Sequence, residues 1–153
     1  MGIAISNKQR LLKIDRKRLL RNTNFWLNFV SSEEKMVSLV FVRDSKMQIF
    51  NSQFRGIDET TDVLAFPDFF ESNEYDKNDI LENLRDKNFL GDVIISTDEV
   101  LRLSFEEKKS TDDLIDELFL HGILHLHDYD HQSNKDRVRM REVERKLYRN
   151  RPN

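Results

Sequence analysis

The chain has 153 residues, no cysteine and a formal net charge of −3 at pH 7. This length predicts a single domain over residues 1–153 with enough chain to bury a core. The lack of cysteine excludes disulfides and thiolate zinc sites, so histidine or carboxylate must hold any metal. Because there is neither a run of about 18 apolar residues nor a signal-peptide segment, we expect a cytoplasmic protein without membrane contact.

Charge is unevenly distributed along the chain. Residues 8–21 hold seven basic side chains and one acidic side chain. Residues 135–151 hold eight basic and three acidic side chains. Residues 55–120 hold seven basic and nineteen acidic side chains. The two basic ends would attract phosphate if they folded onto one face, but charge alone favours two solvated helix faces.

The first half of the chain predicts alternating strands and helices. A short strand is expected over residues 2–5, and an amphipathic helix with a basic polar face over residues 15–30. The β-branched and aromatic run at 36–42 predicts a strand. Ser45 is expected to open a helix that ends near Gly56.

The middle of the chain predicts two more strands. They cover residues 61–66, terminated by Pro67, and residues 90–96. Residues 68–88 are polar and acidic and are interpreted as an excursion of the domain with a short helix.

Three capping boxes predict the starts of the last three helices. They lie at residues 96–99, 110–113 and 133–136, and the helices extend toward Lys109, Leu126 and about Asn150. The resulting order, β-α-β-α-β-β-α-α-α, predicts the α/β (α+β) class, with a mixed central sheet packed with helices.

The histidines form a single cluster at the end of one predicted helix. All four lie within residues 121–131, as His121, His125, His127 and His131. His121 and His125 are one turn apart and share a face, while His131 follows in the turn beyond. This spacing predicts a zincin-like site in which these three hold one zinc ion per chain. His127 lies off that face and is expected to be exposed, with direct ligation as the alternative.

The same spacing occurs in the metzincin peptidases, H-E-x-x-H-x-x-G-x-x-H. Gly122 occupies the position of their general base, and glycine has no side chain that accepts a proton. Peptide hydrolysis by that mechanism is therefore disfavoured. A zinc ion with an open coordination position would still permit phosphodiester cleavage.

Three sequence blocks together form a recognisable pattern. Residues 121–126 (HGILHL) and 129–131 (YDH) are similar to the motif H-G-x-L-H-L-x-G-Y-D-H. Arg55 with residues 61–67 (TDVLAFP), and residues 90–96 (LGDVIIS), form the two other blocks. In all three blocks the sequence resembles the YbeY family of bacterial metallo-endoribonucleases that mature ribosomal RNA.

This resemblance implies a zinc-dependent endoribonuclease that acts on single-stranded RNA in maturation of the 16S ribosomal RNA 3′ end, with ribosomal particles as partners. The family's functional arginine corresponds to Arg55, whose guanidinium could hold a phosphate. On position alone, an ion pair between Arg55 and Asp58 or Glu59 is the simpler interpretation. Basic side chains near the two ends are candidates for guiding the RNA backbone: Lys17, Arg18, Arg139 and Arg145.

Two residues depart from the family pattern. Asp128 replaces a glycine in the turn before His131, where a left-handed conformation would cost aspartate about 1–2 kcal/mol. Ala65 replaces a serine and removes a hydroxyl. Asp130 is a candidate partner for a ligand imidazole N–H.

Two alternative functions remain at this point. One is a zinc peptidase, favoured by the histidine spacing and weakened by Gly122. The other is a non-catalytic ribosome-assembly factor with a structural metal, which would bind RNA without turnover.

Overall fold

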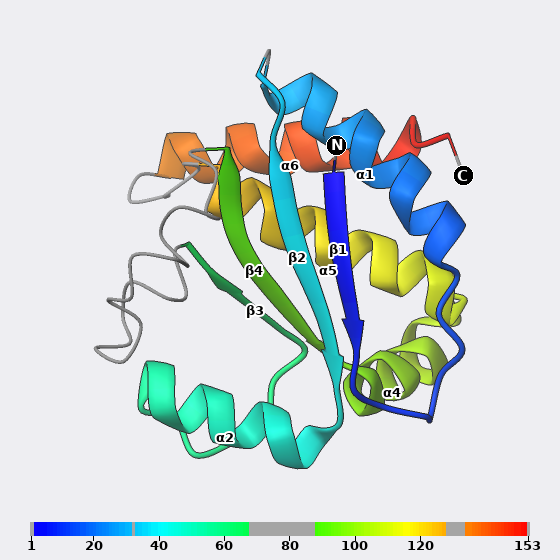
Figure 1. Ribbon diagram of the computed structural model, residues 1–153, viewed down its shortest axis with the longest axis vertical. Coiled ribbons are helices and arrows are strands. Elements are labelled where there is room, and N and C mark those ends of the chain that lie inside the picture. The colour runs from blue at the N-terminus through cyan, green and yellow to red at the C-terminus, as the bar shows by residue number, and fades with distance from the viewer. Residues whose placement is uncertain (1, 32, 68–87, 128–133, 153) are drawn as a thin grey trace, which may run out of the picture.

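A mixed sheet of strand order β1-β2-β4-β3 lies at the centre of the computed structural model, which describes residues 2–31, 33–67, 88–127 and 134–152 (Figure 1). Its strands are β1 (Gly2–Asn7), β2 (Met36–Val42), β3 (Val63–Phe66) and β4 (Phe89–Ser96). β1, β2 and β4 are parallel, and β3 pairs antiparallel with β4. β3 is therefore an edge strand of the described sheet.

The helices within these ranges are α1 (Arg16–Val30), α2 (Asp44–Arg55), α4 (Thr97–Glu107), α5 (Thr111–Leu126) and α6 (Asn134–Arg149). The order of described elements is the predicted one, and the α/β class is confirmed. The excursion predicted at 68–88 lies outside the described residues except for its last position. None of the described helices is long and apolar enough to cross a membrane.

Side chains alternate between the two faces of the sheet, as strand geometry requires. Val37, Leu39 and Phe41 of β2 join the larger core cluster with α1, α4, α5 and α6. Val42 and Ile94, on the opposite face, pack in a smaller cluster with α2. The histidine helix α5 thus lies against the more thoroughly covered face (Figure 1).

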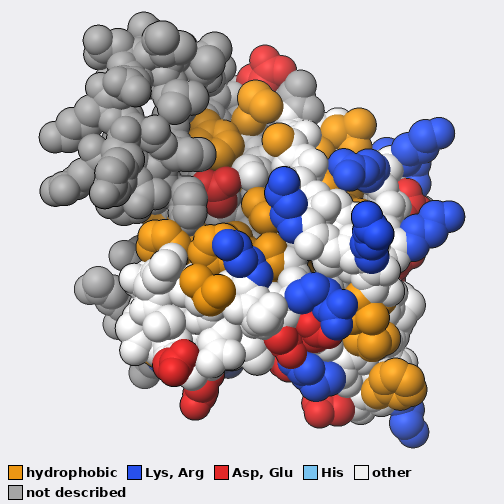
Figure 2. All heavy atoms as spheres, turned by 60° about the horizontal axis from the view of Figure 1, so that its bottom comes forward, with side chains coloured by type: hydrophobic (Ala, Val, Ile, Leu, Met, Phe, Trp, Pro, Cys, Tyr) orange, Lys and Arg blue, Asp and Glu red, His pale blue; other side chains and the backbone are white. Residues whose placement is uncertain are grey.

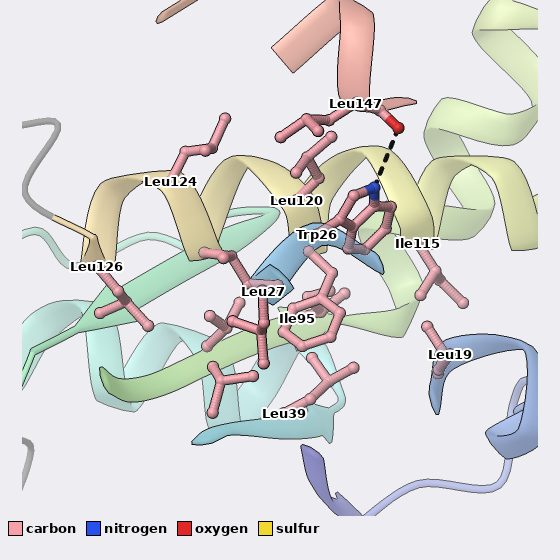
Figure 3. Packing of buried hydrophobic residues seen from close by; sticks show 14 of the residues in the cluster. Leu19, Trp26, Leu27, Leu39, Ile95, Ile115, Leu120, Leu124, Leu126 and Leu147 are labelled. Atoms are coloured by element: carbon pink, nitrogen blue, oxygen red, sulfur yellow. Dashed lines mark hydrogen bonds between the residues drawn. The ribbon is translucent and has the colours of Figure 1, made fainter. Parts of the chain in front are cut away.

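Trp26 joins α1 to α5 and α6. Its ring is fully buried and meets Phe119 of α5 edge to face, with 6.3 Å between ring centroids. Its Nε1–H donates to the Leu147 carbonyl of α6 at 3.1 Å, the bond drawn in Figure 3. These contacts fix α5 from its buried side, with Leu120 and Leu124 in the same core.

The helix starts agree with the capping predictions in two places. The Ser96 hydroxyl accepts the Glu99 N–H, and the Ser110 hydroxyl accepts the Asp113 N–H. The Ser96 box is only half formed, because the Glu99 carboxylate pairs with Arg102. The box predicted at 133–136 lies outside the described side chains.

The start of α2 differs from the prediction. The helix begins at Asp44 after Arg43, which has no capping side-chain bond, so Ser45 is not its cap. Asp98, in the first turn of α4, accepts the backbone N–H of Asp44 at 2.8 Å. It also accepts hydrogen bonds from Nε and Nη2 of the Arg43 side chain, each at 2.9 Å. A carboxylate distant in sequence thus supplies the cap. The C-terminal prediction is confirmed, since Gly56 follows in the left-handed conformation with φ 69°.

Candidate functional site

The last turn of α5 brings two histidines to one point. His121 and His125 have ring centroids 4.4 Å apart, and their Nε2 atoms are 2.9 Å apart. The predicted common face of the helix is confirmed. His127, predicted to be exposed, is half-buried directly after the end of α5, and its N–H donates to the Ile123 carbonyl.

Gly122 sets the distance between this part of α5 and the sheet. A Cβ atom at Gly122 would lie 2.7 Å and 2.9 Å from the two methyl carbons of Val93 in β4. Ordinary carbon contacts are about 3.5–4.0 Å, so the helix could not pack this closely with a larger residue. The glycine therefore has a packing role in addition to lacking a base.

Glu144 of α6 contacts the first histidine from behind. Its two carboxylate oxygens lie 3.2 Å and 3.3 Å from His121 Nδ1. A carboxylate only accepts hydrogen bonds, so Nδ1 carries the proton and Nε2 presents its lone pair in the neutral ring. The hydrogen bond to Glu144 raises the pKa of His121 above its ordinary value, against the opposing effect of burial.

A cleft of about 730 Å³ lies in front of the histidines. His121 and His125 of α5 form one wall, the edge strand β3 forms another, and Arg55 stands where α2 ends. The described lining is completed by residues around β3 and the end of α5: Thr61, Asp62, Val63, Leu64, Ala65, Phe66, Pro67, Gly122 and Leu126. Residues remote in sequence are thus gathered at one concave site.

Arg55 is exposed and directs no hydrogen bond or ion pair to any other described residue. The simpler interpretation, an ion pair with Asp58 or Glu59, is not seen among these residues. Asp58 instead accepts a hydrogen bond from Gln48 at 3.0 Å. The guanidinium therefore stands at the cleft with its donors available to a ligand.

His121 and His125 fit a zinc site in donor type and direction. Two nitrogens bound to a tetrahedral zinc ion at about 2.0–2.1 Å would be roughly 3.3 Å apart, a few tenths of an ångström more than observed. Within the described residues no three histidine or acidic side chains come together as a metal site. The predicted third ligand, His131, lies outside them, as do Asp128 and Asp130.

The sequence profile of the family Endoribonuclease YbeY matches residues 4–151. The chain belongs to this family. A YbeY relative from Clostridium perfringens is 35% identical over 159 residues, which covers 95% of this chain and 94% of the relative. Another relative, from Heliobacterium modesticaldum, is 38% identical over 119 residues, which covers 77% of this chain and 70% of the relative. Both bear the name Endoribonuclease YbeY, and the predicted family is confirmed.

A solved structure shares the fold as well. The solution structure of a Thermotoga maritima protein superposes with a TM-score of 0.61 at 26% identity, covering 95% of this chain and 86% of that one. The two chains therefore share one fold over nearly their whole lengths.

The basic residues near the two ends separate into exposed and buried ones. Lys17, Arg139 and Arg145 are exposed. The assignment of Arg18 to RNA is wrong, because this side chain is buried and pairs with Asp112 and Asp116 of α5 at 2.6 Å and 2.8 Å. A charge count along the sequence does not reveal such burial.

The two basic ends do come together, but around an acid. Arg18 from α1 and Arg151 after α6 both bind the Asp116 carboxylate, which is fully buried. Arg151 also pairs with Asp113 at 2.7 Å. Acidic side chains of α5 thus neutralise part of the positive charge that the two ends carry. The face in Figure 2 likewise shows basic side chains among acidic and apolar ones.

Proposed function

We propose that this protein is a zinc-dependent endoribonuclease that cleaves single-stranded RNA, with ribosomal RNA near the 16S 3′ end as its substrate. The observation that carries the proposal is the convergence of His121, His125 and Arg55 on one cleft. Membership of the endoribonuclease YbeY family supports the same reaction class. The proposal extends to ribosomal particles as partners and to the cytoplasm as the place of action.

The metal proposed for the site is one zinc ion held by His121, His125 and His131. When bound, such an ion lowers the pKa of a water molecule and polarises a phosphoryl oxygen. The chain's own part is to direct imidazole lone pairs into the cleft, which the Glu144 contact and the one-turn spacing of the histidines on α5 allow. Three neutral histidines also leave the ion its positive charge, which suits an anionic substrate.

Arg55 is proposed to bind the phosphate beside the scissile bond. Its guanidinium offers parallel N–H donors that match two phosphate oxygens and stabilise charge developing on them. Its position at the end of α2 gives it reach into the cleft while its backbone is held by the helix. Lys17, Arg139 and Arg145 are proposed to guide the RNA backbone over a wider surface.

The packing at Gly122 counts against a peptidase of the metzincin type. Such an enzyme needs glutamate at this position, but Val93 leaves no room for a side chain. The remaining alternative is an RNA-binding assembly factor without turnover, and the experiment below separates it from the enzyme.

The test is cleavage of single-stranded RNA by purified protein and by His121→Ala and Arg55→Ala variants. Both variants are expected to lose at least about 100-fold in rate, because the first removes a proposed zinc ligand and the second removes the group proposed to bind the phosphate. Lys46→Ala is the matched control, since it removes an exposed cation from the same helix about 13 Å away. Equal cleavage by every variant would show a contaminating nuclease and overturn the proposal. RNA binding with no cleavage by the wild type would favour the assembly factor.

A further inference from the structure

The carboxylate of Glu144 occupies an unusual place on α6. Met140 and Leu147 of the same helix are buried in the core against α5. Glu144 lies four residues after the first and three before the second, so it falls on the same helix face. That face is otherwise apolar, with Val143 and Tyr148 partly buried beside it. A charged side chain in this seam needs a partner, and the contact with His121 supplies it.

The contact places the carboxylate on the ring nitrogen that faces away from the cleft. Glu144 approaches His121 Nδ1, whereas His121 Nε2 is directed toward His125 Nε2. The Glu144 side chain is 20% exposed and that of His121 is 41% exposed, so water competes less at the carboxylate than at the ring. The hydrogen bond thus fixes the ring from the protein side and leaves its other nitrogen facing His125 at the cleft.

We infer that Glu144 is the positioning residue of the metal site, holding His121 in the Nδ1–H tautomer with Nε2 directed at the ion. A carboxylate behind a ligand imidazole fixes its orientation and raises its basicity, and losing such a partner typically weakens metal binding about 10–100-fold. This inference rests on the proposed zinc-dependent function. Asp130, the sequence-based candidate for such a partner, lies outside the described residues.

Three variants of the full-length protein test the inference. Glu144→Leu removes the acceptor and continues the apolar seam between Met140 and Leu147, so the zinc-free protein should keep its thermal unfolding temperature. Glu144→Gln keeps an acceptor oxygen without the charge. Glu142→Gln is the matched control, because Glu142 is an exposed carboxylate on the same helix.

The first measurement is zinc affinity, by competition with a chromophoric chelator. Glu144→Leu is expected to bind zinc about 10–100-fold more weakly than the wild type, Glu144→Gln to fall between them, and Glu142→Gln to stay within about twofold. The second is the tautomer of His121 in the zinc-free protein, from long-range ¹⁵N–¹H NMR correlations at pH 8.5. The Nδ1–H form should dominate in the wild type and in Glu142→Gln and be lost in Glu144→Leu.

The outcomes separate the inference from the function on which it rests. Zinc affinity and His121 tautomer unchanged in Glu144→Leu, in a wild type that binds zinc and cleaves RNA, would overturn the inference alone. A lower unfolding temperature of zinc-free Glu144→Leu with an unchanged tautomer would show a structural role and also overturn it. A wild type that binds no zinc would overturn both the inference and the proposed function.

Discussion

Replacing Gly122 by alanine tests how closely α5 must pack against the sheet. The new Cβ would lie 2.7 Å from one Val93 methyl carbon and 2.9 Å from the other. Overpacking of this kind costs about 1–3 kcal/mol, while alanine in place of glycine inside a helix gains about 1 kcal/mol. We expect a net loss of about 1 kcal/mol and no more than about 2 kcal/mol in the free energy of unfolding.

The assay is urea unfolding of a double-mutant cycle with Val93→Ala, which removes the two methyl groups that obstruct the new Cβ. In the Val93→Ala background, Gly122→Ala should stabilise the protein by its helix propensity, about 1 kcal/mol. Cleavage of RNA should slow in the Gly122→Ala single variant, because displacement of α5 carries His121 and His125 away from Arg55 across the cleft. If Gly122→Ala stabilised both backgrounds equally, the close approach of α5 and β4 would be refuted.

Two further predictions concern buried and capping charges. Arg18→Met should lower the free energy of unfolding by about 3 kcal/mol, because Asp116 is buried and loses one of its cationic partners. The control variant Lys17→Met should change the free energy of unfolding by no more than about 0.5 kcal/mol. Equal urea midpoints for the two variants would contradict the burial of Arg18. The Arg43 guanidinium holds the pKa of Asp98 below its ordinary value of 3.8. Because the pKa is lowered in the folded state, the ionised carboxylate stabilises the protein above pH 3.8, and this stabilisation is lost as the pH falls through the folded-state pKa. Asp98→Asn should therefore lower the melting temperature at pH 7 by an amount that shrinks below about pH 4. A difference in melting temperature that is constant from pH 7 to pH 2 would count against this role.

Local patterns predicted most of the described fold. The strand at 36–42 was predicted with both of its bounds, because a run of β-branched and aromatic residues favours a buried strand wherever it lies. The caps at Ser96 and Ser110 were predicted because each acts within one turn of its own helix. The family motifs added Arg55, whose place at the cleft no local pattern indicates.

The features that prediction missed depend on contacts between distant segments. The start of α2 was misplaced because its cap comes from Asp98, in another helix. Arg18 was assigned to RNA from the charge count alone, because its buried partner Asp116 lies far away in the sequence and could not be anticipated. Glu144 was overlooked on a highly charged helix, although its spacing from Met140 and Leu147 was a usable signal for a polar group in an apolar seam.

The central claim is that cleavage depends on one zinc ion at the histidine site. The most direct measurement is the rate of single-stranded RNA cleavage when zinc is added back in steps to the metal-free protein. The account predicts no cleavage without metal, a rise that saturates at about one zinc per chain, and no recovery in His121→Ala at the same zinc concentrations. A rate that is independent of added zinc, or full recovery in His121→Ala, would contradict it.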